Sequence, residues 1–243
     1  MWRLLGFVAA WAAAPAVALD CRDIAHEGNR YTICEVDAGT EELRLFLRDD
    51  SGTVFGQFHA VNTALKPAGK RLGFAMNGGM FHEDRAPVGL YVENGREQRP
   101  LVKSAGPGNF GLLPNGVFCI RAGRADVIET RAFARARPAC RFATQSGPML
   151  VIDGRMHPRF LKHSDSRHIR NGVGTSRDGK RAVFAISNNT VTFHEFGRLF
   201  RDVLKLDQAL YFDGAISRLY APQLNRSDFG FSLGPIVGVV LPE

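Results

Sequence analysis

The 243-residue sequence lacks several motifs that would assign a chemistry directly. It has no Cys-x-x-Cys pair, which argues against a thiol redox motif and a zinc ribbon. It has no phosphate-binding P-loop and no dinucleotide fingerprint that opens a predicted helix, so we expect no nucleotide cofactor. No Gly-x-Ser-x-Gly elbow surrounds Ser146, which disfavours this side chain as a nucleophile.

Apolar runs of membrane-spanning length are also absent, and the N-terminus instead predicts an export signal. Arg3 is its basic start, Leu4 to Ala14 form its apolar centre, and Ala16-Val17-Ala18 matches the small-x-small cleavage pattern. We therefore expect residues 1–18 to be a signal peptide and residues 19–243 to form the mature domain. The predicted location is periplasmic or secreted, without stable membrane insertion after cleavage.

The composition is that of a globular protein, with 45% hydrophobic and 23% charged residues. The formal net charge is +7, and removal of Arg3 lowers it by one to +6. The basic residues are dispersed, so we interpret them as a solvated surface. Export makes nucleic acid a poor partner, whereas a glycan or sugar-phosphate substrate is compatible with this charge. The sequence does not indicate the oligomeric state.

Four cysteines remain after the predicted cleavage: Cys21, Cys34, Cys119 and Cys140. An even number in an exported chain suggests two disulfides. Proximity along the chain favours Cys21–Cys34 and Cys119–Cys140, although three pairings are possible.

Asn-Gly and Asp-Gly pairs beside apolar runs predict a series of β-hairpins. The pairs are Asn94-Gly95, Asn115-Gly116, Asp153-Gly154 and Asp178-Gly179, and a further hairpin is expected from Leu43–Leu47 and Val54–Phe58 around Ser51-Gly52. The Ala/Arg-rich stretch from Arg131 to Arg141 is interpreted as a loop. We therefore predict an α+β fold: one mainly antiparallel, β-rich domain with a few helices and a pocket formed by strand-end loops.

One helix start is well marked. Thr192-Phe-His-Glu195 fits a capping box, and an apolar face follows at helical spacing. Its members are Phe196, Leu199, Phe200, Val203 and Leu204. The next apolar run, Ala209–Phe212, predicts a strand that ends at Asp213-Gly214. A weaker pattern over Val61–Lys66 indicates a second helix.

Four clusters share one arrangement, in which small residues and a polar side chain follow a strand end. They are Asn77-Gly78-Gly79-Met80-Phe81, Gln145-Ser146-Gly147-Pro148-Met149-Leu150, Arg170-Asn171-Gly172-Val173-Gly174 and Phe212-Asp213-Gly214-Ala215. Glycines let a backbone turn sharply and approach a ligand closely. Each cluster alone is also compatible with an ordinary turn.

In this order and spacing, the clusters resemble the phosphodiester glycosidase family, which includes the lysosomal uncovering enzyme that removes N-acetylglucosamine from a sugar-1-phosphodiester. The family pattern resembles Asn-Gly-Gly-Phe, Ser-Gly-Gly-Pro, Arg-Thr-Ala-x-Gly, a capped helix and Asp-Gly-Gly-Gly-Ser, and the resemblance runs from about Gly73 to the C-terminus. The departures are an inserted Met80, a missing glycine in Ser146-Gly147-Pro148, Asn171-Gly172 for Thr-Ala, and Ala215 and Ile216 for two glycines. The chain therefore resembles a divergent bacterial member whose substrate differs from that of the uncovering enzyme.

The resemblance implies hydrolysis of the glycosidic bond of a sugar-1-phosphodiester in an envelope or environmental glycan. This reaction develops oxocarbenium character at the anomeric carbon, which a carboxylate attacks or stabilises. Asp213 is the first candidate for that carboxylate. Glu195 aligns with a glutamate of the family helix, although the capping box also explains it. Arg170 is expected to hold the phosphate.

The remaining candidates are expected to bind substrate and shape the pocket: Asn77, Gly78, Gly79, Gln145, Ser146, Gly147 and Gly214. His157, His163 and His168 near Asp165 match no specific zinc motif, so we assign no metal. Two alternatives stay open. One is a non-catalytic glycan-binding module, which the altered Asp213 motif favours, and the other is a metal-dependent envelope phosphodiesterase that cuts the P–O bond.

Overall fold

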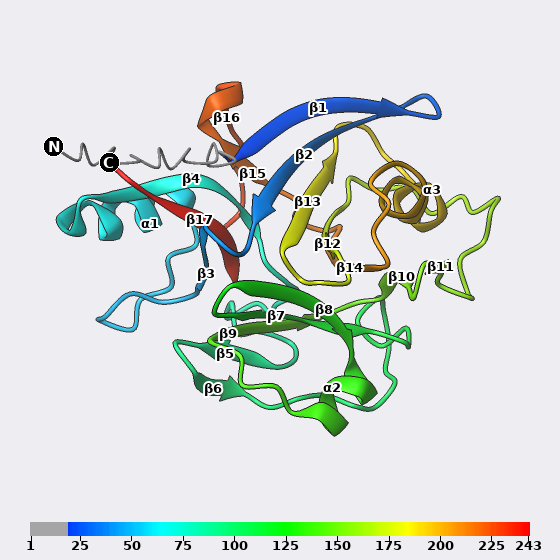
Figure 1. Cartoon of the computed structure of the whole chain (residues 1–243), viewed down its shortest axis with the longest axis horizontal. Helices are drawn as coiled ribbons and strands as arrows, with labels where there is room; N and C mark the ends of the chain where they lie inside the picture. Colours follow the sequence, from blue (N-terminus) through cyan, green and yellow to red (C-terminus); the bar gives the residue numbers. More distant parts are fainter. Residues whose placement is uncertain (1–18) are drawn as a thin grey trace, which may run out of the picture.

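The computed structural model describes residues 19–243, so the signal peptide expected at residues 1–18 lies outside the described part of the chain (Figure 1). The described residues form three sheets, and every paired strand is antiparallel to its neighbour. The first sheet has the order β1 (Asp20–His26), β2 (Asn29–Asp37), β13 (Arg181–Ser187), β12 (Asn171–Thr175), β14 (Gln208–Asp213), β10 (Met149–Ile152) and β11 (Arg155–Met156).

The second sheet has the order β16 (Arg226–Ser227), β15 (Leu219–Ala221), β4 (Lys70–Asn77), β17 (Ile236–Pro242) and β3 (Glu42–Phe46). The third has the order β6 (Arg96–Arg99), β5 (Tyr91–Glu93), β9 (Phe142–Ser146), β7 (Gly116–Arg121) and β8 (Arg124–Glu129). The helices are α1 (Phe58–Leu65), η1 (Lys66–Ala68), α2 (Thr130–Ala136), α3 (Phe193–Arg198), the π-helical η2 (Leu199–Val203) and η3 (Pro222–Leu224). Figure 1 shows the third sheet and α2 below the other two sheets. The predicted α+β, mainly antiparallel fold is confirmed.

The three sheets meet at an aromatic centre to which each contributes a fully buried phenylalanine. Phe74 on β4 lies 4.8 Å from Phe184 on β13 between ring centroids, and Phe118 on β7 lies 5.6 Å from Phe184. Phe212 on β14 joins them at 6.2 Å from Phe118. Because Phe212 directly precedes Asp213, the position of that carboxylate depends on the packing of this centre.

Several local predictions are confirmed. Asn94-Gly95 joins β5 to β6, Asp153-Gly154 joins β10 to β11, and the segment with Asp178-Gly179 joins β12 to β13. Thr192 and Glu195 form the predicted capping box, and α1 covers most of the expected second helix. Of the predicted apolar face, Phe196, Leu199, Phe200 and Leu204 are buried, whereas Val203 is exposed.

Other local predictions are wrong or hold only in part. Asn115-Gly116 is not a hairpin, because the Asn115 amide is buried against Phe110 and Thr130 and Gly116 already belongs to β7. The segment Leu43–Phe58 forms a hairpin only close to its turn. Arg48 bridges Val54, and the amides of Asp49 and Phe55 donate to the carbonyls of Thr53 and Leu47. Further out, β3 pairs with β17 and Phe58 begins α1.

The stretch expected to be a loop between Arg131 and Arg141 begins within α2. Glu129 caps this helix, and its carboxylate accepts hydrogen bonds from the amides of Arg131 and Ala132. A cap of this kind satisfies amides that lack partners at a helix start, so it favours the helix over a loop.

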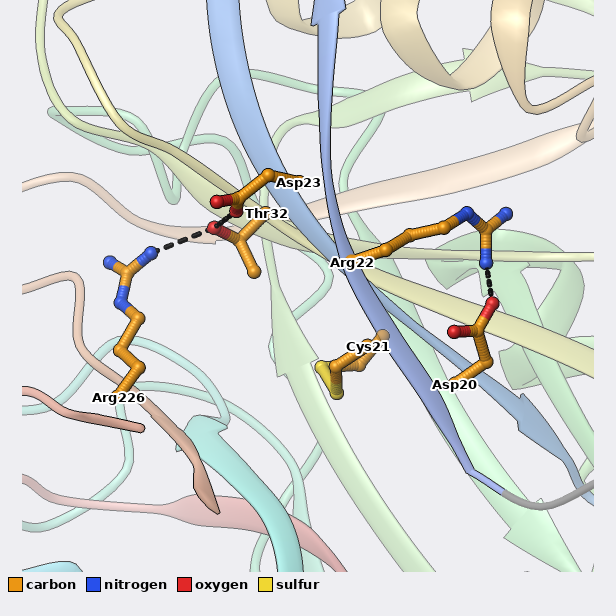
Figure 2. The surroundings of a disulfide bond; sticks show 7 residues. Asp20, Cys21, Arg22, Asp23, Thr32 and Arg226 are labelled. Atoms are coloured by element: carbon orange, nitrogen blue, oxygen red, sulfur yellow. Dashed lines mark hydrogen bonds and ion pairs between the residues drawn. A yellow bond between two sulfur atoms is a disulfide. The ribbon is translucent and has the colours of Figure 1, made fainter. Parts of the chain in front are cut away.

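Both expected disulfides form. Cys119–Cys140 ties β7 to the segment after α2, and Cys21–Cys34 joins β1 to β2. Figure 2 shows Cys21 near Thr32, whose hydroxyl donates to the Asp23 carboxylate and accepts a hydrogen bond from Arg226 on β16 at 2.9 Å. The first and second sheets are therefore linked here by side chains as well as by the core. Among residues 19–243, no helix has both the length and the apolar character that crossing a membrane requires.

Glu93 on β5 provides a pH-dependent test of this packing. Burial raises the pKa of its carboxyl to about 7, although the hydrogen bond from the Tyr91 hydroxyl lowers it. A carboxyl with a raised folded-state pKa makes the protein lose stability as the pH rises from about 4.5 to 7. We expect Glu93→Gln to match the parent near pH 4 and to exceed its unfolding free energy by about 1 to 2 kcal/mol at pH 8. Urea unfolding across this range measures the difference, with the exposed Glu97→Gln as control, and a pH-independent difference would contradict the assignment.

Candidate active site

A reciprocal pair of buried asparagines joins the first two sheets. Asn77 is the last residue of β4 and Asn171 the first of β12, and both are fully buried. The Asn77 Nδ2 donates to Asn171 Oδ1 at 3.1 Å, and Asn171 Nδ2 donates back to Asn77 Oδ1 and to the Asn77 carbonyl, each at 3.0 Å. A buried amide is costly unless it is hydrogen-bonded, so each asparagine fixes the other.

The same pair holds the turn that carries Asp213. Asn171 Oδ1 accepts the Asp213 amide at 3.1 Å, and Asn77 Oδ1 accepts the Arg218 amide at 3.0 Å. Ser217 Oγ, between these two points, donates to the Asp213 carbonyl at 2.8 Å. Both ends of the turn are therefore attached to the asparagine pair.

The Asp213 carboxylate is held by backbone amides within this turn. Its Oδ1 accepts the amides of Gly214 at 2.7 Å and Ala215 at 3.0 Å. Burial raises the pKa of Asp213, and these amides oppose that shift. Within residues 19–243 this carboxylate forms no ion pair. It is therefore a fixed, half-buried negative group without a protein cation to neutralise it.

Replacement of two family glycines by Ala215 and Ile216 does not strain this turn. Neither residue has a positive φ angle, and the Ala215 amide still binds the carboxylate. The backbone conformation that would require glycine is absent at these two positions. The Asp213 carboxylate therefore keeps its amide bonds despite the altered motif.

Arg170 is a buried cation without a carboxylate partner among the described residues. Arg170 directly precedes β12 in the chain, and the residue is 1% exposed. Nε donates to the Val191 carbonyl at 2.9 Å and Nη2 to the Ser166 carbonyl at 3.1 Å, whereas Nη1 has no partner within residues 19–243. Burial lowers the pKa of Arg170, and the nearby Tyr211 hydroxyl opposes this. A buried guanidinium with an unused donor suits an anionic ligand.

An aromatic stack sets the position of this guanidinium. The Arg170 Cζ lies 3.7 Å from the centroid of the Phe193 ring, which stacks on Phe160 at 5.0 Å. Phe160 in turn stacks on buried His157 at 4.7 Å. His157 thus belongs to the stack, and the described residues contain no group of three or more histidine, cysteine or acidic side chains arranged to hold a metal.

Tyr211 lies beside Arg170, whose Cζ is 5.4 Å from the centroid of the Tyr211 ring, and was not found by sequence reasoning. It is almost fully buried, burial raises the pKa of its phenol, and its hydroxyl is close enough to both charges and to Asn109 for each to affect that pKa. A Cβ atom placed on Gly214 would clash with the Tyr211 Oη, so Gly214 leaves room for the phenol. Residues two apart on a strand place their side chains on the same face of the sheet. This spacing could have predicted from the sequence that Tyr211 lies on the same face as Asp213.

Comparison with known proteins assigns the chain to a family. Residues 70–235 match the family model described as phosphodiester glycosidase. The chain belongs to the phosphodiester glycosidase family. It is 36% identical over 185 residues to the uncharacterized protein YigE of Escherichia coli (strain K12), covering 76% of this chain and 72% of that protein.

A solved structure shows the same fold. The catalytic domain of zebrafish N-acetylglucosamine-1-phosphodiester alpha-N-acetylglucosaminidase, auto-inhibited by its pro-peptide, matches with a TM-score of 0.61. The match covers 93% of this chain and 85% of that chain at 12% identity. At this identity the match establishes the fold, while the family model establishes membership in the phosphodiester glycosidases.

The other predicted site residues of this member of the phosphodiester glycosidase family are engaged by the protein itself. Gln145 accepts the amides of Leu90 and Val102 through Oε1, and its Nε2 donates to the Val102 carbonyl and Thr130, so the amide is saturated. Ser146 Oγ donates to the Phe212 carbonyl at 2.8 Å and so anchors the strand that ends at Asp213.

The predicted pocket glycines allow close backbone packing. A Cβ atom on Gly78 would lie 3.1 Å from the Val237 amide nitrogen, and one on Gly79 would lie 2.7 Å from Thr144 Oγ1. Gly147 packs against Asn115 in the same way. These three glycines therefore let neighbouring segments approach one another at the strand ends.

Glu195 lies in the capping box rather than with Asp213. Its carboxylate accepts the Thr192 amide at 2.8 Å and pairs with Arg167 at 3.0 Å. Burial raises the pKa of Glu195, but these hydrogen bonds and the Arg167 charge outweigh that effect and lower it. Asp213 and Glu195, the two carboxylates predicted to be catalytic, share no hydrogen-bond partner among the described residues.

Removal of one asparagine should destabilise the whole site. In Asn77→Ala, the Asn171 amide and the Arg218 amide lose buried partners, so we expect the unfolding free energy to fall by about 2 to 4 kcal/mol. Chemical denaturation measures this loss, and Gln98→Ala on the exposed strand β6 is the control. A change below about 0.5 kcal/mol would show that the pair does not hold the sheets together.

The fit between Gly214 and Tyr211 predicts a rescue. Gly214→Ala should lower the unfolding free energy by about 1 to 3 kcal/mol, because its Cβ clashes with the phenol oxygen. Adding Tyr211→Phe removes that oxygen and should recover part of the loss. Gly106→Ala, whose Cβ would meet no atom within 4 Å, is the matched control. Strictly additive single and double variants would contradict the proposed clash.

Proposed function

We propose that this protein hydrolyses the glycosidic bond of a sugar-1-phosphodiester in an envelope or environmental glycan. The observation that carries the proposal is the buried Arg170 guanidinium, which has an unused donor and no carboxylate partner among the described residues. Tyr211 lies close enough to this cation and to Asp213 to be affected by both charges. The two disulfides support an exported location, periplasmic or secreted.

The charges of the site complement those of the transition state. The anomeric carbon gains positive charge as its bond to the phosphate oxygen breaks, and Asp213 attacks or stabilises that carbon. The departing phosphate is negative, and Arg170 holds it through Nη1. Phosphate is a good leaving group, so the reaction needs little general-acid help.

Two nearby groups have supporting roles in this proposal. Burial raises the pKa of Tyr211, so its phenol stays protonated and can donate a hydrogen bond to substrate. The pKa of Glu195 is lowered within its capping box, so it stays ionised and is a poor proton donor. We therefore place Glu195 outside the chemical step, as the group that fixes α3 and Arg167. Asn77, Gln145 and Ser146 would act by holding the frame around the substrate.

Product analysis tests the proposal on a panel of sugar-1-phosphodiesters. We expect free sugar plus a phosphomonoester, with kcat lowered about 10³-fold or more in Asp213→Asn and KM raised in Arg170→Gln. Asp165→Asn, on an exposed loop, is the control. Because the pKa of Asp213 is raised, kcat/KM should decline with falling pH at values above the ordinary aspartate range near pH 4.

The same panel separates the alternatives. Sugar-1-phosphate as the product would assign P–O cleavage and a phosphodiesterase. Tight binding of one substrate without turnover would assign a glycan-binding module. Unchanged turnover in Asp213→Asn on a verified substrate would remove Asp213 from the mechanism.

A further inference from the structure

A long irregular segment joins the end of β6 to the start of β7. Its residues, 100–115, contain no helix or strand. Connections of this length without secondary structure are uncommon in compact domains, and they often carry binding or catalytic groups. We call residues 101–112 the Asn109 loop.

Buried side-chain amides hold the Asn109 loop at both ends. Gln145, which is 1% exposed, accepts the Val102 amide at 3.0 Å and donates to the Val102 carbonyl at 2.6 Å. Asn115 is fully buried and donates to the Phe110 carbonyl at 2.8 Å. Because buried amides require such partners, Gln145 and Asn115 fix the path of the loop.

The backbone of the loop also packs against itself. A Cβ atom on Gly111 would lie 2.0 Å from the Gly106 carbonyl oxygen, so the two arms of the loop are in main-chain contact. The Leu112 amide donates to the Asn109 carbonyl at 3.2 Å. Asn109 therefore lies in a closed turn with a fixed backbone, although its side chain is exposed.

Two main-chain hydrogen bonds bring this segment beside the strand that carries Tyr211. The Met149 amide donates to the Pro114 carbonyl at 3.0 Å, and the Tyr211 amide donates to the Pro148 carbonyl at 3.1 Å. Burial raises the pKa of Tyr211, and a hydrogen bond from the Asn109 side chain is among the contacts that lower it. A hydrogen bond that lowers the pKa of a phenol stabilises the phenolate, so Asn109 donates to the phenol oxygen.

The direction of this hydrogen bond affects what the Tyr211 hydroxyl can do. A phenol has one hydrogen to donate and an oxygen that accepts. With Asn109 donating to that oxygen, the hydrogen is left for another acceptor. The Arg170 Cζ lies 5.4 Å from the centroid of the Tyr211 ring, so a phosphate held by Arg170 would place acceptor oxygens beside this hydroxyl.

We infer that Asn109 is a positioning residue that directs the Tyr211 hydroxyl toward the phosphate held by Arg170. This inference rests on the proposed function and adds a residue to its phosphate site. The phosphate oxygens gain negative charge as the bond to the anomeric carbon breaks, so a hydrogen bond aimed at them strengthens during the reaction. Asn109 acts through Tyr211 and does not itself touch the substrate.

A double-mutant cycle tests this role on a hydrolysed sugar-1-phosphodiester. Asn109→Ala should lower kcat about tenfold and change KM by less than about threefold, because the directed hydrogen bond is strongest in the transition state. In a Tyr211→Phe background the same substitution should have no further effect, since no hydroxyl remains to be directed. Ser104→Ala, at an exposed position of the same loop, is the matched control and should keep the parental kcat. Additive effects of the two substitutions, or an unchanged kcat in Asn109→Ala, would overturn the inference.

Binding of inorganic phosphate, measured by calorimetry, separates the inference from the reaction. Arg170→Gln should abolish this binding, and Asn109→Ala should weaken it about three- to tenfold in the parent but not in Tyr211→Phe. If no sugar-1-phosphodiester is hydrolysed but this non-additive loss is found, the role of Asn109 at the phosphate site stands and the proposed function fails. If a substrate is hydrolysed but the two substitutions act additively, the proposed function stands and the inference fails.

Discussion

The reciprocal hydrogen bonds between Asn77 and Asn171 are the constraint on which the site depends. They join the end of β4 to the start of β12 in a fully buried position, where neither side-chain amide can hydrogen-bond to water instead. The remaining capacity of the two Oδ1 atoms fixes the amides of Asp213 and Arg218. One pair of side chains therefore joins two sheets, positions the carboxylate and fixes the Arg218 amide at the other end of its turn.

Around this frame, two opposite charges are kept available rather than paired with protein groups. Asp213 is held by amides and Arg170 by carbonyls and the Phe193 ring, and neither forms an ion pair within residues 19–243. A buried cation without a counter-charge lowers stability, which is typical of a group retained for ligand binding. The arrangement suits a substrate that is negative at phosphate and becomes positive at the adjacent carbon.

The sequence predicted features that depend on neighbouring residues. The capping box of Thr192 and Glu195, the strand that ends at Asp213 and three of the turn-centred hairpins are confirmed because their signals are local. The hairpin expected around Ser51 forms only close to its turn, because β3 takes a partner from the far end of the chain. No local pattern reports such a long-range pairing.

The candidate site was predictable in part for the same reason. The motifs identified the strand ends, and they brought Asp213 and Arg170 into the candidate set. They could not show that the Gln145 amide is saturated by four hydrogen bonds to main chain and Thr130, because those partners lie 15 to 55 residues away. They also missed Tyr211, since its phenol lies within an apolar run and its proposed role depends on Arg170, which lies beside it only in the folded chain.

Hydrolysis in water enriched in ¹⁸O tests the central claim most directly, namely that Asp213 and Arg170 promote cleavage at the anomeric carbon. The account predicts that the label enters the anomeric hydroxyl of the released sugar and that the phosphomonoester stays unlabelled. Label in the phosphate would show attack at phosphorus and would contradict the account.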